Sequence, residues 1–191
     1  MDYIELQNKV RTMIKPSRFV HSLGVAETAF LLAKRFDLAG DKALCAGIYH
    51  DAYRYSADGK CIELLRKNGF VIEKEEEEEP MLLHGALAAL YFDEDAGEPV
   101  GDDMKRAVRY HTLGSKDMGP LGAAIYIADY IEPGRKHLSD EKRTEILNLA
   151  TMEEMITEII TLQRPYLEST GTELAGISEE LYEYIEKGGK L

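Results

Sequence analysis

The chain of 191 residues is short of basic residues, of cysteine and of long apolar runs. It has 23 Lys and Arg against 35 Asp and Glu, which gives a net charge of −12 at pH 7. Proteins that bind nucleic acid need positive charge to release counterions from the phosphate backbone, so this balance argues against a nucleic-acid partner. No stretch approaches the roughly 20 apolar residues of a membrane helix, and the N-terminal residues lack the layout of a signal peptide. We therefore expect a cytoplasmic protein that does not bind membranes.

The two cysteines, Cys45 and Cys61, form no CxxC motif and have no metal-type partner beside them. A disulfide scaffold and a cysteine-based metal site are both excluded by this pattern, and we expect buried or idle thiols. Hydrophobic residues make up 45% of the chain and charged residues 30%, close to the average of globular proteins. Length and composition therefore predict one domain over residues 1–191.

A strand pattern is also lacking. Apolar residues recur at helical spacing, and no segment alternates strictly with β-branched enrichment, so the predicted fold class is all-α, a single compact helical bundle. The first expected helices cover about residues 2–14, 41–51, 58–67, 80–92, 102–111 and 121–132. A further long helix, capped by Ser17, is expected between the first two of these.

The C-terminal part, about residues 139–188, is also expected to be helical. Ser139 and Thr151 are typical N-caps, and Thr151 forms a capping-box pattern with Glu154. Pro165 is expected to kink or break the helix that follows. Ser178 is expected to start a terminal amphipathic helix.

The one low-complexity segment is the glutamate run Glu75–Glu79. Adjacent carboxylates repel one another and cannot all be buried, so the run predicts a solvated loop or the start of a helix. Weak cation binding is the most it would support, because a specific metal site needs ligands held by a scaffold.

The chemistry-bearing residues are few. Four of the five histidines lie within expected helices or at their ends, and one precedes an aspartate. Asp129 lies in an apolar helix, where an unpaired carboxylate would be costly, so it should face a cation, strong donors or solvent. Each residue alone could be structural, but together they form an imidazole and carboxylate set that suits iron, manganese or zinc. The six residues are His21, His50, Asp51, His84, His111 and Asp129.

The order and surroundings of these residues form a pattern. Its segments are Arg18-Phe19-Val20-His21, Ala46-Gly47-Ile48-Tyr49-His50-Asp51, His84-Gly85, His111-Thr112 and Ala128-Asp129-Tyr130-Ile131-Glu132-Pro133-Gly134-Arg135. The pattern resembles the HD-domain metal-dependent phosphohydrolases over a core of about residues 17–135. The fuller string looks like one branch, the bacterial symmetrical bis(5′-nucleosyl)-tetraphosphatases, which hydrolyse diadenosine tetraphosphate to two ADP.

The resemblance implies an HD domain with two divalent metal ions. One ion would be held by His21, His50, Asp51 and Asp129, and the other by His84, His111 and the shared Asp51. A carboxylate can bridge two ions, which an imidazole cannot, so Asp51 is the expected central catalytic residue. Metal coordination lowers the pKa of bound water towards about 7, so the expected nucleophile is a metal-bound water. The ligands fit iron, manganese or zinc, and the resemblance implies iron.

Phosphate chains need positive charge in addition to the metals. Arg18 precedes His21 by one helical turn, and Arg135 follows the Asp129 helix in a loop, from which it can reach a phosphate. Their guanidinium groups suit bidentate phosphate contacts, and Lys116 is a looser candidate.

Two further residues, Thr112 and Glu132, are expected to orient a histidine or a water at the metals. The expected partner is a nucleotide: a dinucleoside polyphosphate as substrate and an ADP- or GDP-like product. A homodimer is left open by the sequence.

Two alternative functions stay open. One is another HD-type nucleotide phosphohydrolase or phosphodiesterase, acting on deoxynucleotides or cyclic dinucleotides. The other is a non-catalytic nucleotide-sensing HD module in which metal only holds the helices together. The retention of all six presumed ligands argues against the second alternative.

Overall fold

The computed structural model describes residues 2–191, and over this range the chain forms helices joined by loops, without a β-strand. The predicted all-α fold class is confirmed. The helices are α1 (Tyr3–Met13), α2 (Pro16–Arg35), α3 (Gly40–Tyr49), α4 (Cys61–Lys67), α5 (Lys74–Glu78), the 3-10 helix η1 (Pro80–Leu83), α6 (His84–Ala96), α7 (Asp102–Tyr110), α8 (Gly119–Ile131), α9 (Asp140–Asn148), α10 (Met152–Ser169) and α11 (Gly176–Glu186).

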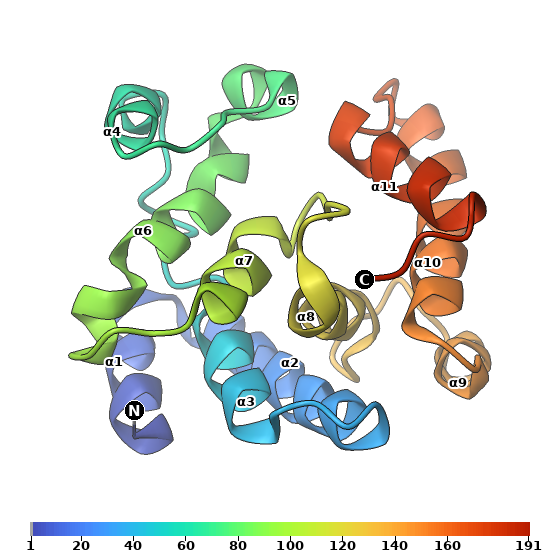
Figure 1. The fold of residues 1–191 in the computed structure, drawn as a ribbon, viewed down its shortest axis with the longest axis horizontal. Coiled ribbons are helices and arrows are strands. Elements are labelled where there is room, and N and C mark those ends of the chain that lie inside the picture. The colour runs from blue at the N-terminus through green and yellow to red at the C-terminus, as the bar shows by residue number, and fades with distance from the viewer. Residues whose placement is uncertain (1) are drawn as a thin grey trace.

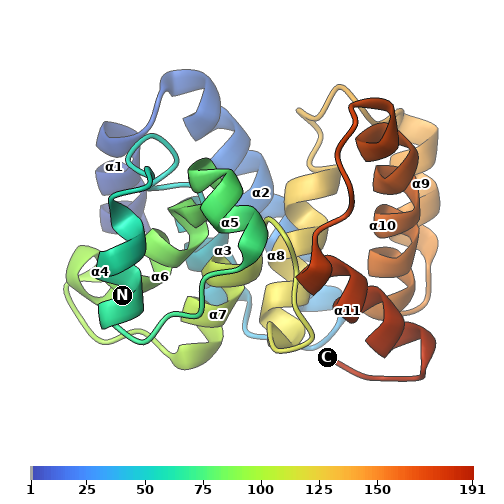
Figure 2. The same ribbon diagram turned by 90° about the horizontal axis from the view of Figure 1, so that it is seen from above.

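Helix α8 lies at the centre of the bundle (Figure 1). It packs against α2, α3 and α7 on one side and against α10 on the other. In the view from above, α9, α10 and α11 gather on one flank of α8 and the earlier helices on the other (Figure 2). Every residue from Leu121 to Ala128 is buried, as expected for a helix that is apolar on all faces.

Two glycines allow helices to approach closely near the presumed ligands. A Cβ atom on Gly47 in α3 would lie 2.6 Å from the Cα atom of Ala26 in α2. A Cβ atom on Gly85 in α6 would lie 2.7 Å from the carbonyl oxygen of Arg109 in α7. These contacts leave no room for a side chain, so the helix pairs that carry the presumed ligands are drawn together at these points.

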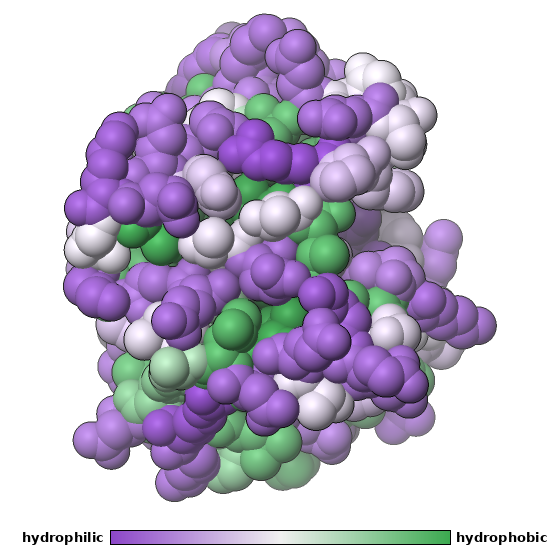
Figure 3. Space-filling model, turned by 90° about the vertical axis from the view of Figure 1, so that its right-hand side faces the viewer, coloured by the Kyte–Doolittle hydropathy of each residue, from purple (hydrophilic) through white to green (hydrophobic). Residues whose placement is uncertain are grey.

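The C-terminal helices cover the far flank of α8. Helix α10 buries a stripe at helical spacing that includes Met155, Ile156, Ile159 and Ile160. The outer surface of this flank is dominated by hydrophilic residues, with hydrophobic atoms showing between them (Figure 3). Among residues 2–191, no helix combines the length and the apolar character that a membrane span requires.

Several predicted helix starts are confirmed and others are wrong. Ser139 caps α9, and Thr151 forms the predicted capping box with Glu154 at the start of α10. Ser17 does not cap α2, because Pro16 already occupies the first helical position, where its fixed φ is favourable. Pro165 lies inside α10, which continues to Ser169.

Two other starts lie later than predicted. Helix α4 begins at Cys61, because Asp58 forms a turn in which its carboxylate accepts from the backbone N–H of Lys60 at 2.9 Å. Pro80 opens the short η1, and α6 begins only at His84.

The glutamate run forms α5 and its end. Glu77, Glu78 and Glu79 are exposed, as predicted, but Glu76 is fully buried. Arg109 in α7 makes a bidentate contact with the Glu76 carboxylate, with Nη2 2.8 Å from Oε2. The burial of this one carboxylate is therefore explained by its cation.

The two cysteines should differ sharply in reactivity. Cys45 is buried in α3, and burial, reinforced by Asp41, raises the pKa of its thiol to about 11. Cys61 is only partly buried. At pH 8 we expect iodoacetamide to modify Cys61 and to spare Cys45 until the protein is unfolded, because the thiolate is the reacting species. Peptide mass spectrometry would test this, and equal modification of both thiols in the native protein would contradict it.

Candidate metal centre

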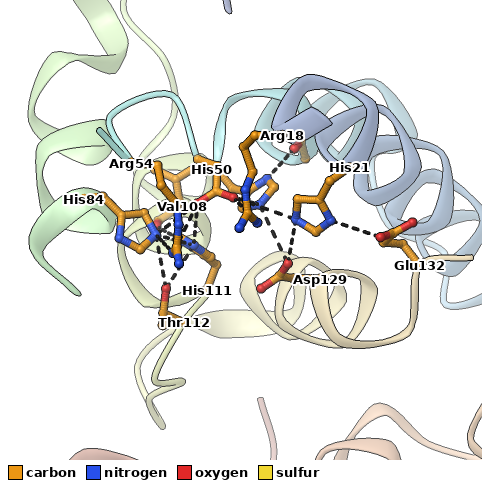
Figure 4. A network of polar contacts seen from close by, with 12 residues as sticks. Arg18, His21, His50, Arg54, His84, Val108, His111, Thr112, Asp129 and Glu132 are labelled. Atoms are coloured by element: carbon orange, nitrogen blue, oxygen red, sulfur yellow. Dashed lines mark hydrogen bonds and ion pairs between the residues drawn. The ribbon is translucent and has the colours of Figure 1, made fainter. Parts of the chain in front are cut away.

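Four histidines from four helices direct their Nε2 atoms towards one region (Figure 4). Three of them, His50, His84 and His111, follow a common pattern at a helix end: each Nδ1 donates to the carbonyl oxygen three residues earlier. Carbonyls of a last helical turn have spare acceptor capacity, and these bonds leave each Nε2 free to act as a ligand. The accepting residues are Gly47, Met81 and Val108, at 2.7, 2.6 and 2.8 Å.

His21 lies within α2, not at a helix end, and uses a carboxylate in place of a carbonyl. Its Nδ1 lies 3.0 Å from Oε1 of the buried Glu132, directly after α8. The contact turns Nε2 of His21 towards Asp129, whose Oδ1 lies 2.9 Å away. Glu132 therefore contacts a presumed ligand histidine, and the carboxylate fixes the orientation of the ring.

Asp51 lies at the centre of the cluster. Its Oδ2 lies 3.2 Å from Nε2 of His50 and 3.7 Å from Nε2 of His21. Its Oδ1 lies 3.1 Å from Nε2 of His84 and 3.9 Å from Nε2 of His111. The two oxygens of one carboxylate thus face two different pairs of imidazoles.

The donor set fits a metal centre. Three groups of residues have ligand atoms within 4.8 Å of one another: His21, His50 and Asp51; His50, His111 and Asp129; and Asp51, His84 and His111. Nε2 of His21, Nε2 of His50 and Oδ1 of Asp51 are buried without a hydrogen-bond partner among the described residues. Such atoms are rare in native proteins, and a cation at the cluster would satisfy them together.

The charges of the cluster are set by its neighbours. Burial alone would raise the pKa of Asp51, but His50 and, more weakly, His84 and His111 hold it well below its usual range. Burial, reinforced by His50 and His84, lowers the pKa of His111 to about 3. Burial lowers the pKa of His50, but the Asp51 carboxylate outweighs this effect and raises it. A cation bound beside Asp51 would displace the proton that this carboxylate stabilises on His50. An ionised carboxylate and neutral imidazoles are the states that bind metal.

Asp129 is also kept ionised. Burial would raise its pKa, but the His21 imidazole, whose Nε2 lies 2.9 Å from Oδ1, lowers it together with His50 and Arg135. Arg135 donates from Nη2 to the Asp129 carboxylate and from Nε to the Asp129 carbonyl at 2.7 Å. The carboxylate of this apolar helix is therefore partnered through its Oδ1 atom by a cation and an imidazole.

Two more arginines reach the cluster. Arg18 Nη1 lies 2.9 Å from Oδ2 of Asp51. Arg54, which is not among the residues predicted from the sequence, lies with Nη1 3.8 Å from Oδ1 of Asp51 and 3.5 Å from Nε2 of His84. Arg54 stands three residues after Asp51, and Arg18 stands three residues before His21, so the same spacing indicates that Arg54 is close to the cluster.

The two remaining candidates differ in position. Thr112 lies in the cluster, with Oγ1 3.0 Å from Nε2 of His111 and 3.4 Å from Nε2 of His84. Lys116 lies outside it, because its Nζ contacts Glu180 of α11 at 3.1 Å on the exposed surface. The contacts of Lys116 thus do not favour a role in phosphate binding.

Helix α11 supports the turn that follows His111. Ser178 donates its hydroxyl to the Leu113 carbonyl at 2.6 Å, and the fully buried Leu181 packs next to Gly114. At the first residue of the same helix, the backbone N–H of Gly176 donates to the Glu75 carboxylate at 2.9 Å.

A cleft of about 240 Å³ opens beside the cluster. It is lined by Arg18, His21, Glu132 and Arg135, together with the half-exposed ring of Tyr55. Two guanidinium groups and one aromatic ring thus border the space next to the presumed ligands.

Residues 18–134 match the model of the HD domain, a span that includes all six presumed ligands. The chain belongs to the HD-domain family. This HD protein is 32% identical over 165 residues to the symmetrical bis(5′-nucleosyl)-tetraphosphatase of Staphylococcus aureus. The matched segment covers 83% of this chain and 81% of the relative. It is also 32% identical over 169 residues to the protein of the same name from Halalkalibacterium halodurans, covering 82% of this chain and 87% of the relative.

The fold of this HD protein is similar to that of a Clostridium acetobutylicum crystal structure, described as a predicted HD superfamily hydrolase involved in NAD metabolism. The TM-score is 0.86 at 27% sequence identity, and the match covers 98% of each chain. The similarity therefore includes the C-terminal helices beyond the part matched by the HD model.

Proposed function

We propose that this HD-domain protein hydrolyses dinucleoside polyphosphates and cuts diadenosine tetraphosphate symmetrically into two ADP. The substrate class is supported by the 32% identity to two proteins named symmetrical bis(5′-nucleosyl)-tetraphosphatase, each matched over more than four-fifths of its length. The reaction class is supported by Asp51, whose two oxygens face separate pairs of imidazoles. We propose that residues 1–191 act as one HD domain in this function.

Two divalent metal ions are part of the proposal. His21, His50, Asp51 and Asp129 would hold one ion, and Asp51, His84 and His111 the other. When bound, such ions supply Lewis acidity towards phosphate oxygens and make water a better nucleophile at neutral pH. The absence of cysteine from the ligands is compatible with iron, manganese or zinc, and we propose iron from the sequence resemblance.

The chain's own cations would bind the phosphate chain. The net charge of −12 repels a polyphosphate at long range, so local positive charge is needed at the site. Arg18 and Arg135 line the cleft, and Arg54 lies on the His84 side of Asp51. Their planar donors can each hold two phosphate oxygens and orient the scissile phosphoryl group.

The position of the cut tests the proposal. Purified protein loaded with iron is expected to convert diadenosine tetraphosphate in heavy-oxygen water into two ADP, one of which carries the label. Chromatography and mass spectrometry separate the products, and metal-stripped protein is the control. AMP and ATP as products would rule out the symmetrical cut, and activity only on deoxynucleotides or cyclic dinucleotides would favour the alternative HD-type function.

A further inference from the structure

The cleft beside the cluster is too small to enclose a nucleotide. Its volume is about 240 Å³, below the roughly 300–1,000 Å³ of pockets that bury most of a small ligand. Arg18, His21 and Arg135 line it next to the presumed ligands, so a phosphate group would lie there. A nucleoside attached to that phosphate must then extend beyond the cleft to the protein surface.

Tyr55 lies where such a nucleoside would emerge. Its side chain lines the cleft and is 50% exposed. It stands four residues after Asp51 in a turn fixed by backbone hydrogen bonds from Arg54 to Asp51 and from Ser56 to Tyr53, both 3.0 Å long. The ring is thus presented to solvent from the segment that carries the central carboxylate.

One face of the ring already has a partner. Nζ of Lys15, which precedes α2, lies 4.6 Å from the centre of the Tyr55 ring, a cation–π contact. The contact restrains the ring, which remains half exposed and can therefore still receive a planar group. An exposed aromatic face next to cationic phosphate-binding residues is the arrangement by which proteins stack nucleobases.

We propose that Tyr55 stacks on a nucleobase of the substrate, with the attached phosphates held by Arg18 and Arg135. The inference rests on the proposed function and adds a specificity-determining residue to it. Every base has a π-face, so stacking selects for a nucleoside over an inorganic polyphosphate and does not select strongly for one base.

Calorimetric titration of the metal-loaded protein with ADP and with inorganic pyrophosphate tests the proposal. Tyr55→Ala should weaken ADP binding roughly tenfold, the size of a single base stack, and leave pyrophosphate binding unchanged. Tyr55→Phe should bind ADP like the wild type, because it keeps the ring. Tyr166→Ala is the matched control, since Tyr166 is 70% exposed on α10 and does not line the cleft.

Three outcomes would overturn the stacking role: unchanged ADP binding in Tyr55→Ala, an equal loss of ADP and pyrophosphate binding, or no rescue by phenylalanine. The proposed function fails separately. If wild-type protein binds ADP through Tyr55 but makes no ADP from diadenosine tetraphosphate, the subsite stands and the symmetrical hydrolase is refuted. If it makes two ADP and Tyr55→Ala binds ADP normally, only the subsite is refuted.

Discussion

Asp51→Asn should reduce the turnover of diadenosine tetraphosphate by roughly a thousandfold or more and lower the metal content of the purified protein. Asparagine keeps the size of the side chain but removes the negative charge and one of the two carboxylate oxygens. In the structure these oxygens face the Nε2 atoms of four histidines at 3.1–3.9 Å. No other described carboxylate contacts all four, so no neighbour can replace it.

The measurement combines product formation with metal analysis of the same samples. Asp58→Asn is the matched control, because it makes the same chemical change at an exposed position in the same loop. The control should keep full activity and metal content. An Asp51→Asn protein that turns over substrate at the control rate with metal bound would refute the central role of this carboxylate, and circular dichroism would show whether the variant is folded.

Arg109→Met should destabilise the protein by about 3–5 kcal/mol, because it leaves the buried carboxylate of Glu76 without its cation. The side chains of Glu76 and Arg109 are 1% and 9% exposed. Arg109 also donates to the Val71 carbonyl at 3.0 Å, so its loss frees a second acceptor. For a chain of this size the melting temperature should fall by roughly 10 °C.

The same glutamate run provides the control. Arg66 pairs with Glu77, but these side chains are 53% and 47% exposed, so Arg66→Met should cost no more than about 1 kcal/mol. Thermal unfolding at a fixed metal concentration would compare the two. The double variant Arg109→Met, Glu76→Leu should recover most of the lost stability, since it removes the orphaned charge. Equal melting temperatures for Arg109→Met and Arg66→Met would contradict the role assigned to the buried pair.

The helical fold was accessible from the sequence because its signals are local. Apolar spacing predicts the helices, and the capping box of Thr151 and Glu154 lies within four residues at the start of α10. The presumed ligands could also be identified from their order along the chain, because the chain has only five histidines and four of them belong to the cluster.

The remaining features depend on contacts between distant residues. The burial of Glu76 could not be predicted, because its partner Arg109 is 33 residues away and nothing local distinguishes it from the other glutamates. The prediction that Ser178 starts the terminal helix is wrong, because α11 begins at Gly176 and the Ser178 hydroxyl bonds to Leu113 across the bundle. For Arg54, the spacing of three residues from Asp51 does predict a place near the cluster, whereas its proximity to His84 cannot be predicted from the sequence.

The contacts of α11 have a consequence for the order in which the chain folds. The Ser178–Leu113 bond joins residues 65 positions apart, and the Gly176–Glu75 bond joins residues 101 positions apart. Closing such long loops is slow, and during synthesis the N-terminal segments emerge first. A nascent chain that has just reached residue 134 already contains the whole segment matched by the HD model, but the turn after His111 still lacks its support. We therefore expect the metal centre to reach its final shape only after the last helix has left the ribosome and docked.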